Sequence, residues 1–280
     1  MTTQERSIVV RQLTPGIGAE IIGASLKDAT PDELSVVKDA VHRHKVVFLR
    51  GQQDITGDIL EEFASALGHL QKYPGTTEKS LVISNHVVGN DVWHCDGSYM
   101  DRVPQYSLLH ALVVPPSGGD TLWANAAHAY ALMPQVLRDF ADSLRVRHSN
   151  VGNLIDVERS QATPAPTLEA LHPLVHVLPE TGERALMLGD HAQYIPGLTK
   201  QESAALIALF QSRIELPENT IRWSWKVGDI AIWDGRNTLH YAVPDYGDDE
   251  RTIRRIWISG ERPLSGVDGF ESEAVRQKNA

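Results

Sequence analysis

From Gly68 onward, the sequence alternates between short apolar runs and clusters of turn-forming residues. The runs are rich in β-branched residues or alternate between apolar and polar ones, which is typical of strands. They cover residues 81–84, 106–114, 174–178, 185–188, 220–225, 230–233 and 252–258, and turn clusters at 116–119, 179–182 and 227–229 separate many of them. So many short strands predict a sandwich or a barrel.

Helices are expected mainly outside this core. Thr30 can cap a helix that begins at Pro31, closes a capping box with Glu33 and runs to about His44. Further helices are predicted at about 58–67, 126–144 and 200–212. The expected fold class is therefore mainly β with flanking helices. A jelly roll fits this pattern, although strand periodicity alone does not fix the topology. No repeat or linker divides the chain, so we expect a single domain over residues 1–280.

The acidic composition excludes several classes of partner. The formal net charge is -10, from 36 acidic and 26 basic residues. We therefore expect no binding to nucleic acid or to an anionic membrane, because both depend on clustered Lys and Arg. Cys95 is the single cysteine, which excludes an intramolecular disulfide and a cysteine-based zinc site. The N-terminal residues lack the apolar stretch of a signal peptide, so a cytoplasmic location is expected. The oligomeric state stays open, a homo-oligomer included.

The sequence His94-Cys95-Asp96 is the first chemical signal. On an extended segment, residues two apart point to the same face, so both side chains can reach one ion. A second imidazole would complete the 2-His-1-carboxylate triad, which leaves positions on Fe(II) open for substrates and oxygen. The best candidate for that imidazole is His240, which follows an apparent buried strand at 229–233. Taken alone, each histidine could equally be hydrogen-bonded within the structure.

Two arginines follow His240 on a predicted strand. A strand–turn–strand would bring Arg251 back beside the metal, and Arg251 and Arg255 share one face of the strand at 252–258. Two arginines facing a barrel interior need anionic partners, because an unpaired buried charge is costly. A guanidinium can clamp a carboxylate with two hydrogen bonds. The alternative for Arg255 is an ion pair with a protein carboxylate such as Asp234 or Asp245. Arg254 faces the other way and is expected at the surface.

Together these motifs resemble those of the taurine / 2,4-dichlorophenoxyacetate dioxygenase family. The resemblance rests on Trp93-His94-Cys95-Asp96, on Gly118-Gly119-Asp120-Thr121, and on Trp233-Asp234-x-Arg236-x-x-x-His240 with Arg251 and Arg255, and it runs from about Ile8 to Arg262. The stretches at 106–121 and 188–192 look more like the aryloxyalkanoate-type members.

The resemblance implies a fold and a set of roles. The fold would be a double-stranded β-helix, that is, a cupin-like jelly roll. The iron ligands would be His94, Asp96 and His240. The cosubstrate-binding residues would be Thr121, Arg251 and Arg255. A threonine on a strand can also be a mere β-former, and the alternative role for Arg255 is to bind the acidic group of the substrate. Pocket-lining candidates are Ser98, Tyr99, Met100 and His191, the last of which could equally be a structural histidine.

The implied reaction needs Fe(II), 2-oxoglutarate and O2. It would oxidise an unactivated C–H bond of a small organic acid (an aryloxyalkanoate, a sulfonate or a related carboxylate) and release succinate and CO2. Where the carbon carries an ether oxygen, a sulfonate or a sulfate, the hydroxylated product would break apart. A desaturase or cyclase on the same scaffold is the alternative, and a cupin-like protein that only binds a metal and an anion is a second one. Cys95 is given no role, and His69, His86, His172 and His176 lack ligand spacing and are expected to be structural.

Overall fold

The computed structural model describes residues 8–84, 91–151, 167–269 and 271–275, and two sheets form its central layers. The larger sheet has the order β1 (Val9–Gln12), β2 (Ala19–Ile22), β3 (Val46–Leu49), β13 (Ile230–Asp234), β5 (Tyr106–Val113), β15 (Thr252–Ile258) and β4 (Ser80–Ser84). The smaller has the order β12 (Thr220–Trp223), β6 (Thr121–Asn125) and β14 (Thr238–Ala242). All these pairings are antiparallel except that of β2 with β3. The jelly-roll fold that the sequence predicts is confirmed.

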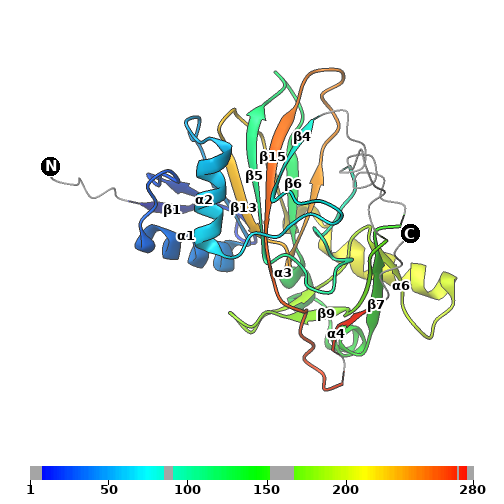
Figure 1. Ribbon diagram of the computed structural model, residues 1–280. Coiled ribbons are helices and arrows are strands. Elements are labelled where there is room, and N and C mark those ends of the chain that lie inside the picture. The colour runs from blue at the N-terminus through cyan, green and yellow to red at the C-terminus, as the bar shows by residue number, and fades with distance from the viewer. Residues whose placement is uncertain (1–7, 85–90, 152–166, 270, 276–280) are drawn as a thin grey trace.

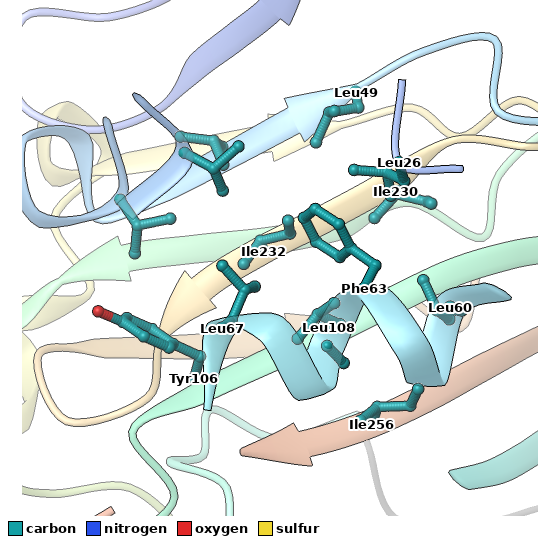
Figure 2. Packing of buried hydrophobic residues seen from close by; sticks show 14 of the residues in the cluster. Leu26, Leu49, Leu60, Phe63, Leu67, Tyr106, Leu108, Ile230, Ile232 and Ile256 are labelled. Atoms are coloured by element: carbon teal, nitrogen blue, oxygen red, sulfur yellow. The ribbon is translucent and has the colours of Figure 1, made fainter. Parts of the chain in front are cut away.

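Helices α1 (Pro31–His44) and α2 (Gly57–Leu67) cover the outer face of the large sheet (Figure 1). The predicted capping box of α1 is present, with Thr30 and Glu33 bonded to each other's backbone N–H groups. Leu60, Phe63 and Leu67 of α2 pack on Ile230 and Ile232 of β13 and on neighbouring strands (Figure 2). Because alternate strand residues face opposite ways, the residues between these point to the other face of the sheet.

That other face meets the smaller sheet and forms the interior of the jelly roll. Trp233 of β13 and Ile253 of β15 belong there to one cluster with Trp123 of β6 and Trp223 of β12. The large sheet thus has an apolar layer on each face, and polar residues of β15 that point inward are enclosed between the sheets. This register places Arg255, which alternates with Ile253, inside.

A second group of elements lies at the opposite end from α1 and α2 (Figure 1). A four-stranded sheet has the order β11 (Ala192–Tyr194), β7 (Arg145–Ser149), β8 (Glu169–Pro173) and β16 (Glu273–Ala274), and β9 (Val175–Val177) pairs with β10 (Arg184–Leu186). The helices here are α3 (Ala126–Ala131), α4 (Gln135–Asp142) and α6 (Lys200–Ile214), followed by the 3-10 turn η1 (Pro217–Asn219). No helix in the described ranges has the length and apolar character needed to cross a membrane.

The single helix predicted at 126–144 is wrong. The structure has α3 and α4 instead, and Pro134 is the residue before α4. Proline has no N–H to continue the hydrogen bonding of α3 and disfavours a helical conformation at the residue before it, so the chain breaks there and restarts. Residues 145–149 and 169–173, which the sequence did not predict as strands, are β7 and β8.

Candidate active site

His94 and His240 are held side by side by their own backbones. The two residues form an isolated β-bridge, in which His94 N–H donates to His240 O (3.0 Å) and His240 N–H donates to His94 O (2.9 Å). His240 lies in the middle of β14, not in a turn after the preceding strand. Directly paired residues of two strands point to the same side, and here the ring centroids are 3.9 Å apart.

Asp96 completes the group, two residues after His94. Its Oδ1 lies 3.9 Å from His94 Nε2, and its Oδ2 lies 3.9 Å from His240 Nε2. One ligand atom from each of the three residues lies within 4.8 Å of the others, and all three side chains are buried. The structure thus brings together the three residues that the sequence singled out.

The donor atoms of this triad fit a divalent metal ion. His94 Nδ1–H donates to Val92 O (2.8 Å), which leaves the lone pair of Nε2 facing the cluster, where Nε2 has no hydrogen-bond partner among the described residues. Burial lowers the pKa of His240 to about 3, so this imidazole is neutral, as a metal ligand must be. Two imidazoles and one carboxylate are the set that suits Fe(II) with open positions.

Two further side chains fix the carboxylate of Asp96. Ser107 Oγ–H donates to Oδ2 (2.8 Å), and Arg255 Nη1 lies 3.3 Å from Oδ1. Burial acts to raise the pKa of Asp96, but His240, Arg255 and His94 and the Ser107 hydrogen bond lower it to about 2. Since His240 is itself neutral at pH 7, Arg255 is the cation that remains beside the ionised carboxylate.

Replacement of Ser107 by Ala is expected to weaken metal binding. The carboxylate would lose the hydrogen bond that orients it, and such outer contacts typically contribute roughly 10- to 100-fold in metal affinity. Equilibrium dialysis of the variant against Mn(II) measures the change, and Ser65→Ala on the exposed side of α2 is the control. Equal affinities in Ser107→Ala and the wild type would contradict this role.

Arg251 is a buried cation held by neutral oxygens. Its Nε–H donates to Gly119 O (2.8 Å) and its Nη2–H to Thr121 Oγ1 (3.2 Å), and only 8% of the residue is exposed. Burial lowers the pKa of Arg251 from its usual value, yet no carboxylate of the described chain forms an ion pair with it. A guanidinium fixed in this way has a free nitrogen to offer an anion, and an anion would offset the cost of burying the charge.

The turn at Gly118 and Gly119 presents that carbonyl to Arg251. Both glycines have positive φ angles, +75° and +69°, and a Cβ on Gly118 would lie 2.5 Å from the backbone oxygen of Asp245. Gly119 N–H donates to Asp245 Oδ1 (2.8 Å), and Asp245 pairs with Arg222 (2.9 Å). Nothing in the amino-acid pattern indicates this contact between residues 126 positions apart. Only glycine adopts such a turn without strain.

Arg255 lies beside two aromatic rings that contact each other, with their centres 4.5 Å apart, and next to the metal triad. Its guanidinium carbon is 4.4 Å from the ring centre of Trp257 and 5.1 Å from that of Tyr73. The partners suggested from the sequence were wrong, because Asp234 pairs with Arg236 and Asp245 with Arg222. The protein carboxylate beside Arg255 is Asp96 itself.

The predicted binding residues fall into two places. A cavity of about 20 Å³ has Thr121, His240, Arg251 and Arg255 in its wall. Tyr99 and Met100 line a separate groove of about 380 Å³, together with Pro74, Leu168 and others. Ser98 and His191 are buried: Ser98 Oγ is bonded to His148 (3.1 Å), and the His191 ring meets the edge of Tyr99.

Of the histidines expected to be structural, His172 and His176 are buried and hydrogen-bonded, whereas His69 is exposed. His172 contacts the carbonyls of Ser98 and Met100, and His176 accepts from the N–H of Leu264. Neither belongs to the metal-binding group of the described residues. His86 lies outside the described ranges.

Comparisons with known proteins agree with this geometry. The family model "Taurine catabolism dioxygenase TauD, TfdA family" matches residues 10–257. An alpha-ketoglutarate-dependent sulfate ester dioxygenase of Pseudomonas putida is 39% identical over 93% of this chain and 92% of its own. An alkylsulfatase of Acinetobacter baylyi is 36% identical over 98% of this chain and 92% of its own. The crystal structure of a taurine dioxygenase from Burkholderia xenovorans superposes with a TM-score of 0.84, at 34% identity over 97% of this chain and 96% of that one.

Proposed function

Because the chain belongs to the TauD/TfdA family of dioxygenases, we propose that it oxidises a monoanionic organic substrate, with an alkyl sulfate ester as the first candidate. The chain is an oxidoreductase that uses Fe(II), 2-oxoglutarate and O2. Neither alternative considered from the sequence, a desaturase or cyclase and a protein that only binds, is favoured by relatives that are named as dioxygenases.

Different residues would bind the metal and the cosubstrate. His94, Asp96 and His240 would hold the iron, and Arg251 would bind the distal carboxylate of 2-oxoglutarate with help from Thr121. Bound Fe(II) supplies the activation of O2, which is coupled to the decarboxylation of 2-oxoglutarate to succinate. The protein keeps the His240 imidazole neutral, fixes Asp96 through Ser107 and Arg255, and surrounds the reacting atoms with buried side chains.

The net charge of the site with Fe(II) and 2-oxoglutarate bound supports the proposal that the substrate is a monoanion. Fe(II) contributes two positive charges and the two arginines one each, whereas Asp96 contributes one negative charge, which leaves 3+. Dianionic 2-oxoglutarate reduces this to 1+. The nearby carboxylate of Asp120 is paired with Arg222, and Asp245, which the same arginine contacts, is exposed to solvent and lies outside this buried charge count. A substrate with a single negative charge therefore makes the buried site neutral, which low-dielectric surroundings favour.

A sulfate ester meets this requirement and explains the chemistry. Hydroxylation of the carbon that bears the ester oxygen gives R-CH(OH)-OSO3⁻, which breaks its C–O bond to release an aldehyde and hydrogen sulfate. The two curated relatives described above are named for sulfate esters and match nearly the whole chain. The short stretches that resemble aryloxyalkanoate enzymes point to a second monoanion of similar charge, so both classes belong in the assay.

The test compares anions with neutral analogues. We expect substrate-dependent succinate formation with hexyl sulfate, accompanied by hexanal and sulfate, and less with phenoxyacetate. Phenoxyacetamide should have a kcat/KM roughly 10- to 100-fold below that of phenoxyacetate, because a hydrogen bond to a charged group contributes about 1.5–3 kcal/mol. In Arg255→Gln, shown first to retain its metal, this difference should largely disappear. If the wild type oxidised the acid and the amide equally well, the site would have no anion requirement and the proposal would be wrong.

A further inference from the structure

The chain turns sharply directly after the metal motif. Residues 98–100, here called the 98–100 loop, follow Asp96 with only Gly97 between them. Gly97 has a φ of +61°, and a Cβ there would lie 2.5 Å from Met100 Cε and 2.8 Å from Pro104 Cδ. Ser98 and Tyr99 are 0% and 1% exposed. The position of this loop is therefore closely tied to that of the metal-binding carboxylate.

One histidine of the four-stranded sheet forms hydrogen bonds to the backbone of the loop on both sides of Tyr99. His172 of β8 has its Nε2 2.9 Å from Ser98 O and 3.1 Å from Met100 O. Carbonyl oxygens only accept hydrogen bonds, so Nε2 carries the proton and donates to both of them. A single ring N–H thus fixes the backbone before and after Tyr99.

The other nitrogen of the same ring, Nδ1, contacts Ser272 in the C-terminal segment. Ser272 Oγ lies 3.1 Å from His172 Nδ1 and 2.8 Å from the carbonyl of Pro263. The His172 side chain is fully buried, and burial lowers its pKa to about 4, so the ring is neutral at pH 7. A neutral ring with the proton on Nε2 leaves Nδ1 as an acceptor, so the single hydroxyl proton of Ser272 is shared between Nδ1 and the carbonyl of Pro263.

Two more histidines complete the surroundings of the loop. His148 of β7, whose ring centre is 5.4 Å from that of His172, has Nδ1 3.1 Å from Ser98 Oγ. The ring of His191 is perpendicular to that of Tyr99, with the centres 4.8 Å apart. The loop is thus fixed by imidazoles of which none belongs to the metal triad. Its outer side, formed by Tyr99 and Met100, lines the groove of about 380 Å³.

We propose that His172, supported by Ser272 and His148, is a positioning residue that fixes the 98–100 loop beside the metal centre and thereby places the substrate for oxidation. The substrate half of this inference rests on the proposed function, whereas the fixing of the loop does not. Among the described residues, the hydrogen-bond partners of His172 include no metal ligand and no cosubstrate-binding residue, so its loss should disturb substrate placement while the affinities for metal and 2-oxoglutarate persist.

The first experiment follows the loop itself. Hydrogen exchange is measured by mass spectrometry on Mn(II)-loaded wild type, His172→Ala, His172→Gln and Ser272→Ala. We expect exchange in the peptide that spans residues 97–105 to be about fivefold faster in His172→Ala, as the loss of a hydrogen bond of about 1 kcal/mol implies. His172→Gln should recover part of the protection, because its amide N–H can donate to the same carbonyls. His176→Gln, at a buried histidine of β9 that does not touch the loop, is the control.

The second experiment measures how well cosubstrate use is coupled to substrate oxidation. In His172→Ala with hexyl sulfate, we expect KM for the substrate to rise about fivefold and succinate to exceed sulfate severalfold, with the Kd for Mn(II) and for 2-oxoglutarate nearly unchanged. Should His172→Ala not fold, Ser272→Ala removes the hydroxyl that contacts His172 Nδ1 and should show the same changes to a smaller extent.

Three outcomes would overturn the inference. The first is unchanged exchange of the 97–105 peptide in the folded variants. The second is an equal change in His176→Gln, which would indicate a global effect. The third is faster exchange with unaltered KM and coupling, which would show that His172 fixes the loop but that the loop does not influence the substrate. If the wild type oxidised none of the anions tested, the proposed function would fail, and the exchange result would still decide whether His172 holds the loop.

Discussion

His240→Ala is expected to lose most of its metal while it keeps its fold. The triad offers three protein ligands, and the binding energy of four-ligand zinc sites, about 10–16 kcal/mol, corresponds to about 2.5–4 kcal/mol for each ligand. Loss of one should therefore weaken metal binding by roughly two orders of magnitude or more. The pairing of His240 with His94 runs through backbone atoms, so the bridge does not depend on the side chain.

Metal content after anaerobic reconstitution with Fe(II), together with the circular dichroism spectrum, checks this prediction. His44→Ala, at the end of α1 and outside the site, is the control for the loss of a histidine. Of the three ligands, His240 gives the cleanest test, because loss of the Asp96 carboxylate would also deprive Arg255 of its anionic neighbour. Full iron content and normal succinate yield in His240→Ala would refute the ligand assignment.

Arg251→Ala is expected to bind metal normally and 2-oxoglutarate very weakly. A buried carboxylate that loses its only cationic partner costs about 3–5 kcal/mol, which is roughly two to four orders of magnitude in affinity. Arg251→Lys should recover only part of this, because lysine cannot satisfy Gly119 O and Thr121 Oγ1 and at the same time present a fork to the ligand.

Calorimetric titration of the Mn(II)-loaded variants with 2-oxoglutarate measures the effect. Arg254→Ala is a matched control, since this arginine lies on the same strand but points to the other face, against Gly57 of α2. The control should bind 2-oxoglutarate as the wild type does. An unchanged dissociation constant in Arg251→Ala would show that the cosubstrate carboxylate lies elsewhere.

The sequence predicted many of the strands whose buried residues are aliphatic or aromatic, such as β5, β13 and β15, but not β6 and β14. It missed β7 and β8, in which His148 and His172 occupy inward positions and break the apolar pattern. A buried histidine counts as polar in such a pattern, although its ring is enclosed as fully as a leucine would be. The same two histidines contact the 98–100 loop. The residues that interrupted the apolar pattern, and so prevented prediction of these strands, are therefore also those that form specific hydrogen bonds to the loop.

The site shows a similar division. The spacing of His94 and Asp96 and the shared face of Arg251 and Arg255 follow from local strand geometry, and the structure places these residues accordingly. The hydrogen-bond partners of these residues could not be predicted from local strand geometry. Contacts such as that of Asp245 with Gly119 depend on how segments far apart in the sequence pack together. Ser107 had only a weak signal, as one small polar residue in an apolar strand.

The backbone bridge between His94 and His240 makes the two imidazoles comparable to a rigid bidentate chelator. Their spacing is set by peptide hydrogen bonds before any ion arrives, so little conformational entropy remains to be lost on binding. Such a chelator can bind several divalent ions at one fixed spacing of its two nitrogen donors. The third donor therefore decides which metal is preferred. Replacement of Asp96 by a longer or softer donor is therefore the place to begin if the metal preference of this scaffold is to be redesigned.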